Sequence, residues 1–257
     1  MSIEKGNLIK IQLETNNLDM DSQLKIFLDL PRHRILNSLI IKYCKHDNDI
    51  ADIGCGNTCA QLRHLQTLGY TSLTGVDFNL NVKYSGINLI EQDLEEWKIF
   101  PKKYDAIILA DVIEHLRYPR YLLKNAMSSL KDGGMIFLSV PNAGHFYNGM
   151  LLTFFPRHLN MSSAFGPWGH NYFFTYYGLM NLFKKFDLEV VEYRASGLEF
   201  RYMSMHWIKR IAMWALNVIP MLLNFGPFMK YFSDHLYFVL RKKNDNFLEL
   251  SNKELYE

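Results

Sequence analysis

The stretch Asp49-Ile50-Ala51-Asp52-Ile53-Gly54-Cys55-Gly56-Asn57 is followed, one helix-length segment later, by Gly75-Val76-Asp77. An apolar strand that runs into a glycine-rich turn, then a helix, then a second strand ending in a carboxylate predicts a βαβ unit. Gly54 and Gly56 let the backbone take positive φ or approach a ligand closely. Asp77 lies where it can accept both hydroxyls of a ribose. The pattern therefore predicts a site for a cofactor that contains a nucleoside.

The details of the turn favour one class of cofactor. A helix that opens at Asn57 or Thr58 would point free N–H groups at the site. A dinucleotide site prefers a third glycine or alanine where this chain has Cys59. Asp52, two residues before the first glycine, would repel a pyrophosphate and suits a cationic amine. We therefore expect a cofactor with an ammonium group, and an NAD-dependent enzyme stays as an alternative.

Composition limits the other possibilities. The chain has 257 residues with 49% hydrophobic content, which is enough for one sizeable α/β domain. The formal net charge is +2 and no long basic run occurs, which argues against nucleic acid as the main partner. Three cysteines without metal-ligand spacing, and no apolar leader at the start, predict a reduced cytoplasmic setting.

Apolar runs alternate with helical periodicity along the middle of the chain, which predicts a doubly wound, mostly parallel seven-stranded sheet of the α/β class. The expected strands are 49–53, 73–76, 87–91, 104–110, 135–140, 188–193 and 236–241. Helices are expected within 21–45, from the glycine turn to about 68, over 121–130 and over 175–186. The predicted organisation is leading helices over 1–48, a catalytic domain over 49–241 with a lid at about 141–171 and a helical insert at about 199–233, and a polar tail over 242–257.

The stretch 202–232 is rich in Met, Trp and Leu but is interrupted by Lys209, Arg210 and Pro220. Its uninterrupted apolar run is shorter than the roughly 20 apolar residues of a membrane span. Three interpretations remain open: a cover over the substrate pocket, a homodimer interface, or a helix that contacts the inner membrane surface.

With this order of elements in view, the chain resembles the class I S-adenosylmethionine-dependent methyltransferases of the small-molecule type. The resemblance is to the ubiquinone-type O-methyltransferase group and its relatives in bacterial polysaccharide and secondary-metabolite pathways. It rests on six segments: ADIGCGN (51–57), GVDFN (75–79), EQDLEEW (91–97), YDAIILADVIEHL (104–116), GGMIFLSVPNAGH (133–145) and HNYFFTYYGLMNLFKKFDLEVVE (170–192). One departure is Thr58, which stands where many family members have another glycine.

The resemblance implies a cofactor, S-adenosylmethionine with S-adenosylhomocysteine as product, and a set of residues that contact it. Asp52 is expected at the methionyl amine, and Ala110 with Asp111 along the methionyl end. Gly54 and Gly56 are expected under the cofactor, and Cys55 between them is counted with the cofactor-binding residues. Residues expected at the nucleoside are Asp77 on the ribose, Phe78 along the adenine, and Asp93 with the backbone N–H of Leu94 at the adenine edge. Asp93 has a second interpretation, as a cap of the segment that follows it.

The sulfonium already activates the methyl group, so the remaining task is to deprotonate a hydroxyl acceptor. A histidine with an ordinary pKa near ~6.5 is suited to this. The candidates are His115, His145 and His170, of which we favour the last two. No metal is expected, since no cluster has ligand spacing in the sequence. The predicted reaction is O-methylation of a small molecule or glycan precursor; N-methylation of an amino sugar and a catalytically inactive scaffold or binding protein are the alternatives.

Overall fold

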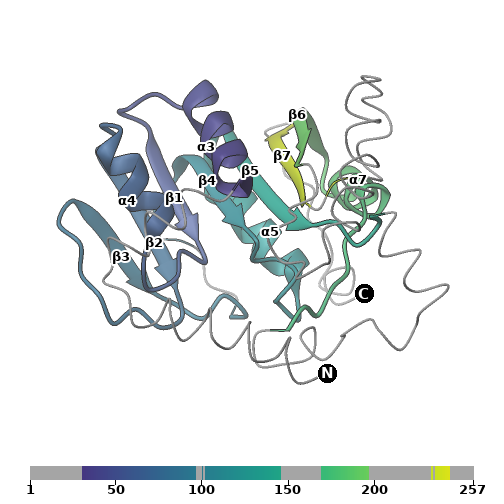
Figure 1. The fold of residues 1–257 in the computed structure, drawn as a ribbon, viewed down its shortest axis with the longest axis horizontal. Helices are drawn as coiled ribbons and strands as arrows, with labels where there is room; N and C mark the ends of the chain where they lie inside the picture. Colours follow the sequence, from purple (N-terminus) through teal and green to yellow (C-terminus); the bar gives the residue numbers. More distant parts are fainter. Residues whose placement is uncertain are drawn as a thin grey trace, which may run out of the picture.

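The computed structural model describes residues 31–96, 100, 102–145, 169–196, 233 and 235–243. Its centre is a seven-stranded sheet in the order β3-β2-β1-β4-β5-β7-β6 (Figure 1). The strands are β1 (Asp49–Ile53), β2 (Ser72–Asp77), β3 (Ile87–Glu91), β4 (Tyr104–Ala110), β5 (Leu130–Pro141), β6 (Leu188–Ala195) and β7 (His235–Lys242). All neighbours are parallel except β7, which is antiparallel to both β5 and β6. The predicted doubly wound, mostly parallel sheet is confirmed.

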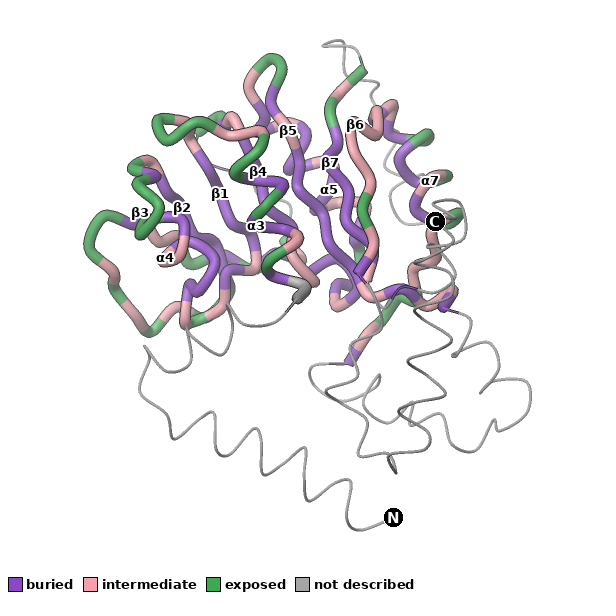
Figure 2. Tube along the Cα trace, turned by 45° about the horizontal axis from the view of Figure 1, so that its top comes forward, coloured by how far each residue is buried: buried purple, intermediate pink, exposed green. Residues whose placement is uncertain are grey.

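Helices cover both faces of this sheet. They are α3 (Pro31–Tyr43), α4 (Ala60–Thr67), α5 (Pro119–Ser128) and α7 (Tyr176–Lys185). The side chains of α3 and α4 share one buried cluster with Ile50 and Ile108, whereas those of α5 and α7 share the other with Ala51 and Ile107. Neighbouring residues of one strand thus enter opposite cores, which is why these strands are continuous apolar runs. Figure 2 shows the central strands buried along most of their length.

Two predicted boundaries are wrong. The helix after the glycine turn begins at Ala60 and not at Asn57 or Thr58, because Gly56 (φ 63°) and Cys59 (φ 45°) keep the preceding residues out of the helical region. The strand expected at 135–140 begins earlier, at Leu130, so Gly133 and Gly134 lie inside β5, where the register against β4 shifts. The irregularity accommodates the left-handed φ of 73° at Gly133.

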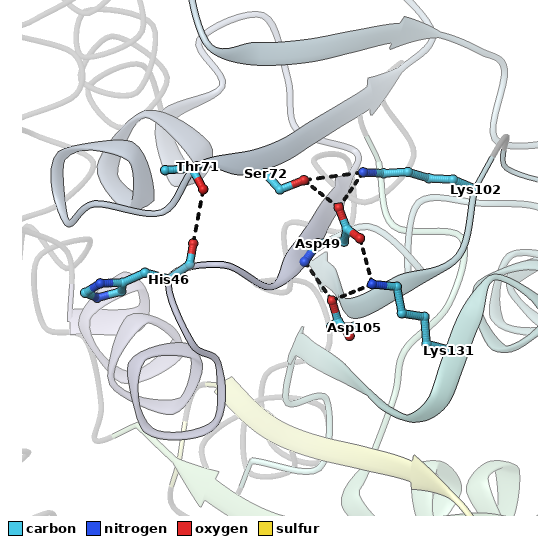
Figure 3. A network of polar contacts seen from close by, with 7 residues as sticks. All are labelled: His46, Asp49, Thr71, Ser72, Lys102, Asp105 and Lys131. Atoms are coloured by element: carbon cyan, nitrogen blue, oxygen red, sulfur yellow. Dashed lines mark hydrogen bonds and ion pairs between the residues drawn. The ribbon is translucent and has the colours of Figure 1, made fainter.

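An ion-pair network holds the amino ends of the strands together. Asp49 accepts hydrogen bonds from Lys102 at 2.6 Å and Lys131 at 2.7 Å, and also from the hydroxyl of Ser72 (Figure 3). Lys131 reaches Asp105 as well, at 2.8 Å. Lys102, then Lys131 and Ser72, hold the pKa of Asp49 far below its usual range. This network lies at the edge opposite the glycine turn, so we assign it to stability.

The predicted leading helices before residue 31, most of the lid (146–168), most of the insert (197–232) and the tail from 244 lie outside the described residues. Among the helices that are described, none has the length and apolar character that a membrane crossing requires.

Candidate functional site

The glycine turn lies between β1 and α4, at the carboxyl edge of the sheet, where parallel α/β proteins bind ligands. The N–H of Gly54 donates to the carbonyl of Val76 at 2.7 Å, which ties the turn to β2. Gly54 has φ 83°, and a Cβ on it would lie 2.4 Å from a methyl carbon of Val112. Gly54 is therefore required by both conformation and space. Gly56 has φ 63° but open space beside it: no atom of the described residues lies within 4 Å of where its Cβ would stand.

Asp77, at the end of β2, braces this turn. One carboxylate oxygen accepts the N–H of Gly56 at 2.8 Å, and the other accepts the N–H of Phe78 at 2.8 Å. A carboxylate oxygen has two acceptor positions, so each oxygen retains one for a further donor such as a ribose hydroxyl. Asp77 is 9% exposed, which places this capacity at the rim of the site.

Asp52 lies on β1 beneath the turn, opposite Gly75 of β2 and Ile108 of β4. Its side chain is 3% exposed, and no hydrogen bond or ion pair from the described part of the chain reaches its carboxylate. Burial, and then the neighbouring charge of Asp77, raise its pKa to about 7. A buried carboxylate without a partner costs free energy unless a cation approaches it. Asp52 therefore fits the amine of a cationic cofactor.

Two predicted nucleoside contacts lie after the second and third strands. Phe78 is 52% exposed, as a residue that covers a flat ligand can be. Asp93 is exposed and its Oδ1 accepts the N–H of Glu95 at 2.9 Å, so its carboxylate closes a local turn. Leu94 is buried in the core. The capping interpretation of Asp93 is thus present in the geometry, and its second oxygen is not used by this bond.

The two cysteines of the turn are close to each other. Cys55 and Cys59 are buried, and their sulfur atoms lie 3.9 Å apart. Cys59 also lies 3.4 Å from the carbonyl oxygen of Gly56. Both thiols are free. They fill the space behind the turn.

Asp111 follows β4 with a left-handed φ of 53°. Its N–H donates to the carbonyl of Ser139 at 3.0 Å, and the Ser139 hydroxyl donates to its Oδ1 at 2.8 Å. Its Oδ2 lies 3.7 Å from Nε2 of His235, the first residue of β7. Ala110, the last residue of β4, pairs with Ser139. The methionyl-end residues Ala110 and Asp111 are thus fixed against β5 and β7.

His235 is a residue that sequence reasoning missed. Functional groups are expected where parallel strands end, whereas His235 begins a strand. Because β7 runs antiparallel to β5, its first residue lies opposite Pro141, the last residue of β5. The signal that points to His235 is the antiparallel pairing and not a sequence motif.

His115 and His170 lie together. Their ring centroids are 4.8 Å apart. Nδ1 of His115 lies 3.2 Å from the carbonyl oxygen of Gly169, and Nε2 lies 3.9 Å from Oε1 of the buried Glu114. Burial, and next the charge of His115, lower the pKa of His170, while Asp111 opposes this. The lowered pKa favours the neutral imidazole of His170, whose lone pair can accept a proton.

His145 is placed elsewhere. It is 4% exposed, and its backbone N–H donates to the carbonyl of Asn142 in the turn after β5. Asn142 in turn donates to the carbonyl of Ser233 at 2.9 Å. The titratable cluster found among the described residues contains His115 and His170 but not His145. Of the three candidate bases, the structure brings two together.

A pocket of about 270 Å³ opens beside this cluster, between the start of α5 and α7. It joins aromatic rings with two cations. Its lining consists of Tyr118, Pro119, Arg120, Tyr172, Phe173, Phe174, Thr175, Gly178, Asn181, Leu182 and Lys185. The N–H of Tyr172 donates to the carbonyl of Glu114 at 3.0 Å, so one segment forms both the pocket wall and the histidine pair.

Sequence comparison shows which known proteins this chain is similar to. The ubiquinone biosynthesis O-methyltransferase of Rickettsia felis is 28% identical over 159 residues, which cover 55% of this chain and 63% of that protein. The tRNA U34 carboxymethyltransferase of Nautilia profundicola is 30% identical over 127 residues, which cover 44% of this chain and 41% of that protein. The chain thus spans less than two thirds of the length of these relatives.

Two solved structures share the fold. A SAM-dependent methyltransferase from Archaeoglobus fulgidus has a TM-score of 0.52 at 19% identity, over 82% of this chain and 94% of that one. Coclaurine N-methyltransferase, bound to N-methylheliamine and SAH, has a TM-score of 0.56 at 16% identity, over 82% and 70%. A model of the methyltransferase-domain family matches residues 20–193. Since this match covers more than half of the chain, the protein belongs to the methyltransferase-domain family.

Proposed function

We propose that this protein transfers a methyl group from S-adenosylmethionine to an oxygen atom of a small molecule or glycan precursor. The observation that supports it most directly is the buried Asp52 beneath the Gly54–Gly56 turn. This carboxylate has no hydrogen bond within the described residues, and a cationic amine is the partner that would stabilise its charge.

Each part of S-adenosylmethionine has residues in the site that fit it. When bound, S-adenosylmethionine supplies a methyl group activated on a sulfonium. Asp52 would hold the amine, Asp77 would accept the ribose hydroxyls, and the open space at Gly56 would admit the ligand close to the backbone. Ala110 and Asp111 would line the methionyl end.

The acceptor side is formed by imidazoles. A hydroxyl acceptor must lose its proton as the methyl group is transferred, and a neutral histidine can take it. His170 fits this task because burial and His115 lower its pKa. His115 is the second choice and the buried His145 the third. An amine acceptor needs no such base once it is neutral, so the alternative, N-methylation, does not depend on these residues.

The cofactor site is tested by calorimetry with S-adenosylhomocysteine. We expect Asp52→Asn to weaken binding by about 10-fold or more, as the loss of a charged hydrogen bond of about 1.5–3 kcal/mol implies. Asp132→Asn, which removes an exposed carboxylate from β5, is the matched control and keeps wild-type affinity. Asp52 is preferred over Asp77 because Asp77→Ala would also release the N–H groups of Gly56 and Phe78. Equal affinities for wild type and Asp52→Asn would refute the assignment.

The acceptor chemistry is tested with a screen of phenols, sugars and amines. For a hydroxyl acceptor, His170→Gln should lower kcat by about 10²–10⁴-fold and leave the affinity for S-adenosylhomocysteine unchanged. If turnover is found with an amine instead, and His170→Gln has the same kcat, N-methylation replaces O-methylation. Tight cofactor binding without turnover of any acceptor would favour the scaffold alternative.

The proposed partners are a small-molecule or glycan-precursor acceptor and no nucleic acid. The segment 202–232 lies outside the described residues, so a homodimer interface and a membrane-surface contact both remain predictions, as does the cytoplasmic location.

A further inference from the structure

Three side chains with metal-binding atoms meet beside the candidate acceptor site. Glu114, His115 and His170 each present one such atom, and the three atoms all lie within 4.8 Å of one another. Two imidazoles and one carboxylate form a ligand set of intermediate softness. Such a set suits Zn²⁺ and its first-row neighbours, whereas Mg²⁺ and Ca²⁺ prefer oxygen ligands alone.

The orientation of His115 matches that of a metal ligand. Its Nδ1 lies 3.2 Å from the carbonyl oxygen of Gly169. A carbonyl only accepts, so this contact places the proton on Nδ1 and leaves the lone pair on Nε2. A backbone carbonyl that fixes the tautomer in this way is the usual outer partner of a metal-binding histidine. The same Nε2 lies 3.9 Å from Oε1 of Glu114.

The backbone holds the cluster together across a long separation in sequence. The N–H of Asn171 donates to the carbonyl of Glu114 at 2.7 Å, and its side-chain amide donates to the carbonyl of His115 at 2.6 Å. His170 is therefore fixed beside the other two residues by its neighbour. Glu114 is 1% exposed, and a bound cation offsets the cost of burying its charge. The three residues are thus held near one another before an ion binds.

We propose that Glu114, His115 and His170 bind one divalent first-row transition-metal ion of the zinc class. Two ligands about 2.0–2.1 Å from a tetrahedral ion lie about 3.4 Å apart, so the three atoms, which lie within 4.8 Å of one another, need to close by up to about 1.4 Å. An imidazole whose lone pair is held by the ion cannot accept a proton. The consequence, which rests on the proposed function, is that His170 cannot act as the general base while the ion is bound, whereas cofactor binding at Asp52 is unchanged.

The test is a titration of the purified full chain with Co²⁺, followed by calorimetry and visible absorption. Cobalt is chosen because ligation by a cysteine would add a sulfur-to-metal band, which the proposal excludes. We expect one ion per chain, and at least about 10-fold weaker binding for Glu114→Gln and for His170→Gln. The control is His46→Gln, an exposed histidine before β1, which keeps wild-type affinity.

The absence of Co²⁺ binding to the wild type, or equal affinity in both cluster variants, overturns the proposal. Circular dichroism checks that each variant folds, and if one does not, the other decides. S-adenosylhomocysteine binding is measured on the same samples. Cofactor binding without metal binding removes this inference alone, whereas metal binding without cofactor binding removes the proposed function.

Discussion

Replacing Asp52 with Asn should make the cofactor-free protein more stable at neutral pH, although it weakens the cofactor site. In the folded chain the pKa of Asp52 is raised from 3.8 to about 7 by burial and by Asp77. Each pKa unit is about 1.36 kcal/mol, so the ionised carboxylate destabilises the fold by at most about 4 kcal/mol. Asn has nearly the same shape and cannot ionise. We expect the variant to gain about 2–4 kcal/mol at pH 8.

The sign of the pH dependence follows from the raised pKa. Between about pH 4 and pH 7, folded Asp52 holds its proton while unfolded Asp52 has lost it, so the wild type loses stability as the pH rises. Above about pH 7 both states are ionised and the penalty is constant. The difference between Asp52→Asn and wild type should therefore be small near pH 4, grow up to about pH 7, and then level off.

Urea unfolding of both proteins across this pH range measures the difference directly, without cofactor. Adding S-adenosylhomocysteine should stabilise the wild type more than the variant, because only the wild type offers a carboxylate to the amine. If the two stability curves stay parallel from pH 4 to pH 8, Asp52 ionises normally. Asp52 would then hold no destabilised charge for the cofactor to neutralise.

Three further substitutions test stability and cofactor binding at other positions. Gly54→Ala should lower the free energy of unfolding by about 2–4 kcal/mol, because a Cβ would meet Val112 at 2.4 Å on a left-handed backbone. Gly56→Ala should lower the free energy of unfolding by only about 1–2 kcal/mol, because its methyl group enters open space. The same methyl group should reduce the affinity for S-adenosylhomocysteine. Lys131→Met should destabilise the protein at pH 7, and the loss should vanish in urea titrations as the pH falls through the low pKa of Asp49, since that pair contributes only while Asp49 is ionised.

The strands could be predicted from the sequence because their burial determines their composition. Central strands buried on both faces must be apolar throughout, and β1, β3 and β4 have the predicted bounds. The backbone of the glycine turn could not be predicted in the same way. Nothing in the residue type of Cys59 indicates a left-handed φ of 45°, and this value delays α4 to Ala60. Such a conformation is set by tertiary contacts and not by local propensity.

In the candidate site, too, some residues could be predicted from the sequence and others could not. Asp52 and Asp77 could be predicted because each has a fixed offset from a glycine or a strand end. The group of Glu114, His115 and His170 could not, because no spacing relates the loop after β4 to the segment before α7. Hydrogen bonds from the backbone N–H and the side-chain amide of Asn171 bring them together.

The antiparallel β7 has a consequence for how the site can work. It brings His235 to the edge where the parallel strands end, so the half of the site near β4, β5 and β7 collects imidazoles while the half near β1 and β2 holds buried carboxylates. Carboxylates suit a cationic cofactor, and neutral imidazoles suit proton or metal binding. Asp111 belongs to the second half, since its contacts are with Ser139 of β5 and His235 of β7. We therefore expect the two halves to respond separately to substitution. A variant of Asp52 that changed metal affinity, or a variant of Glu114 that changed cofactor affinity, would contradict this division.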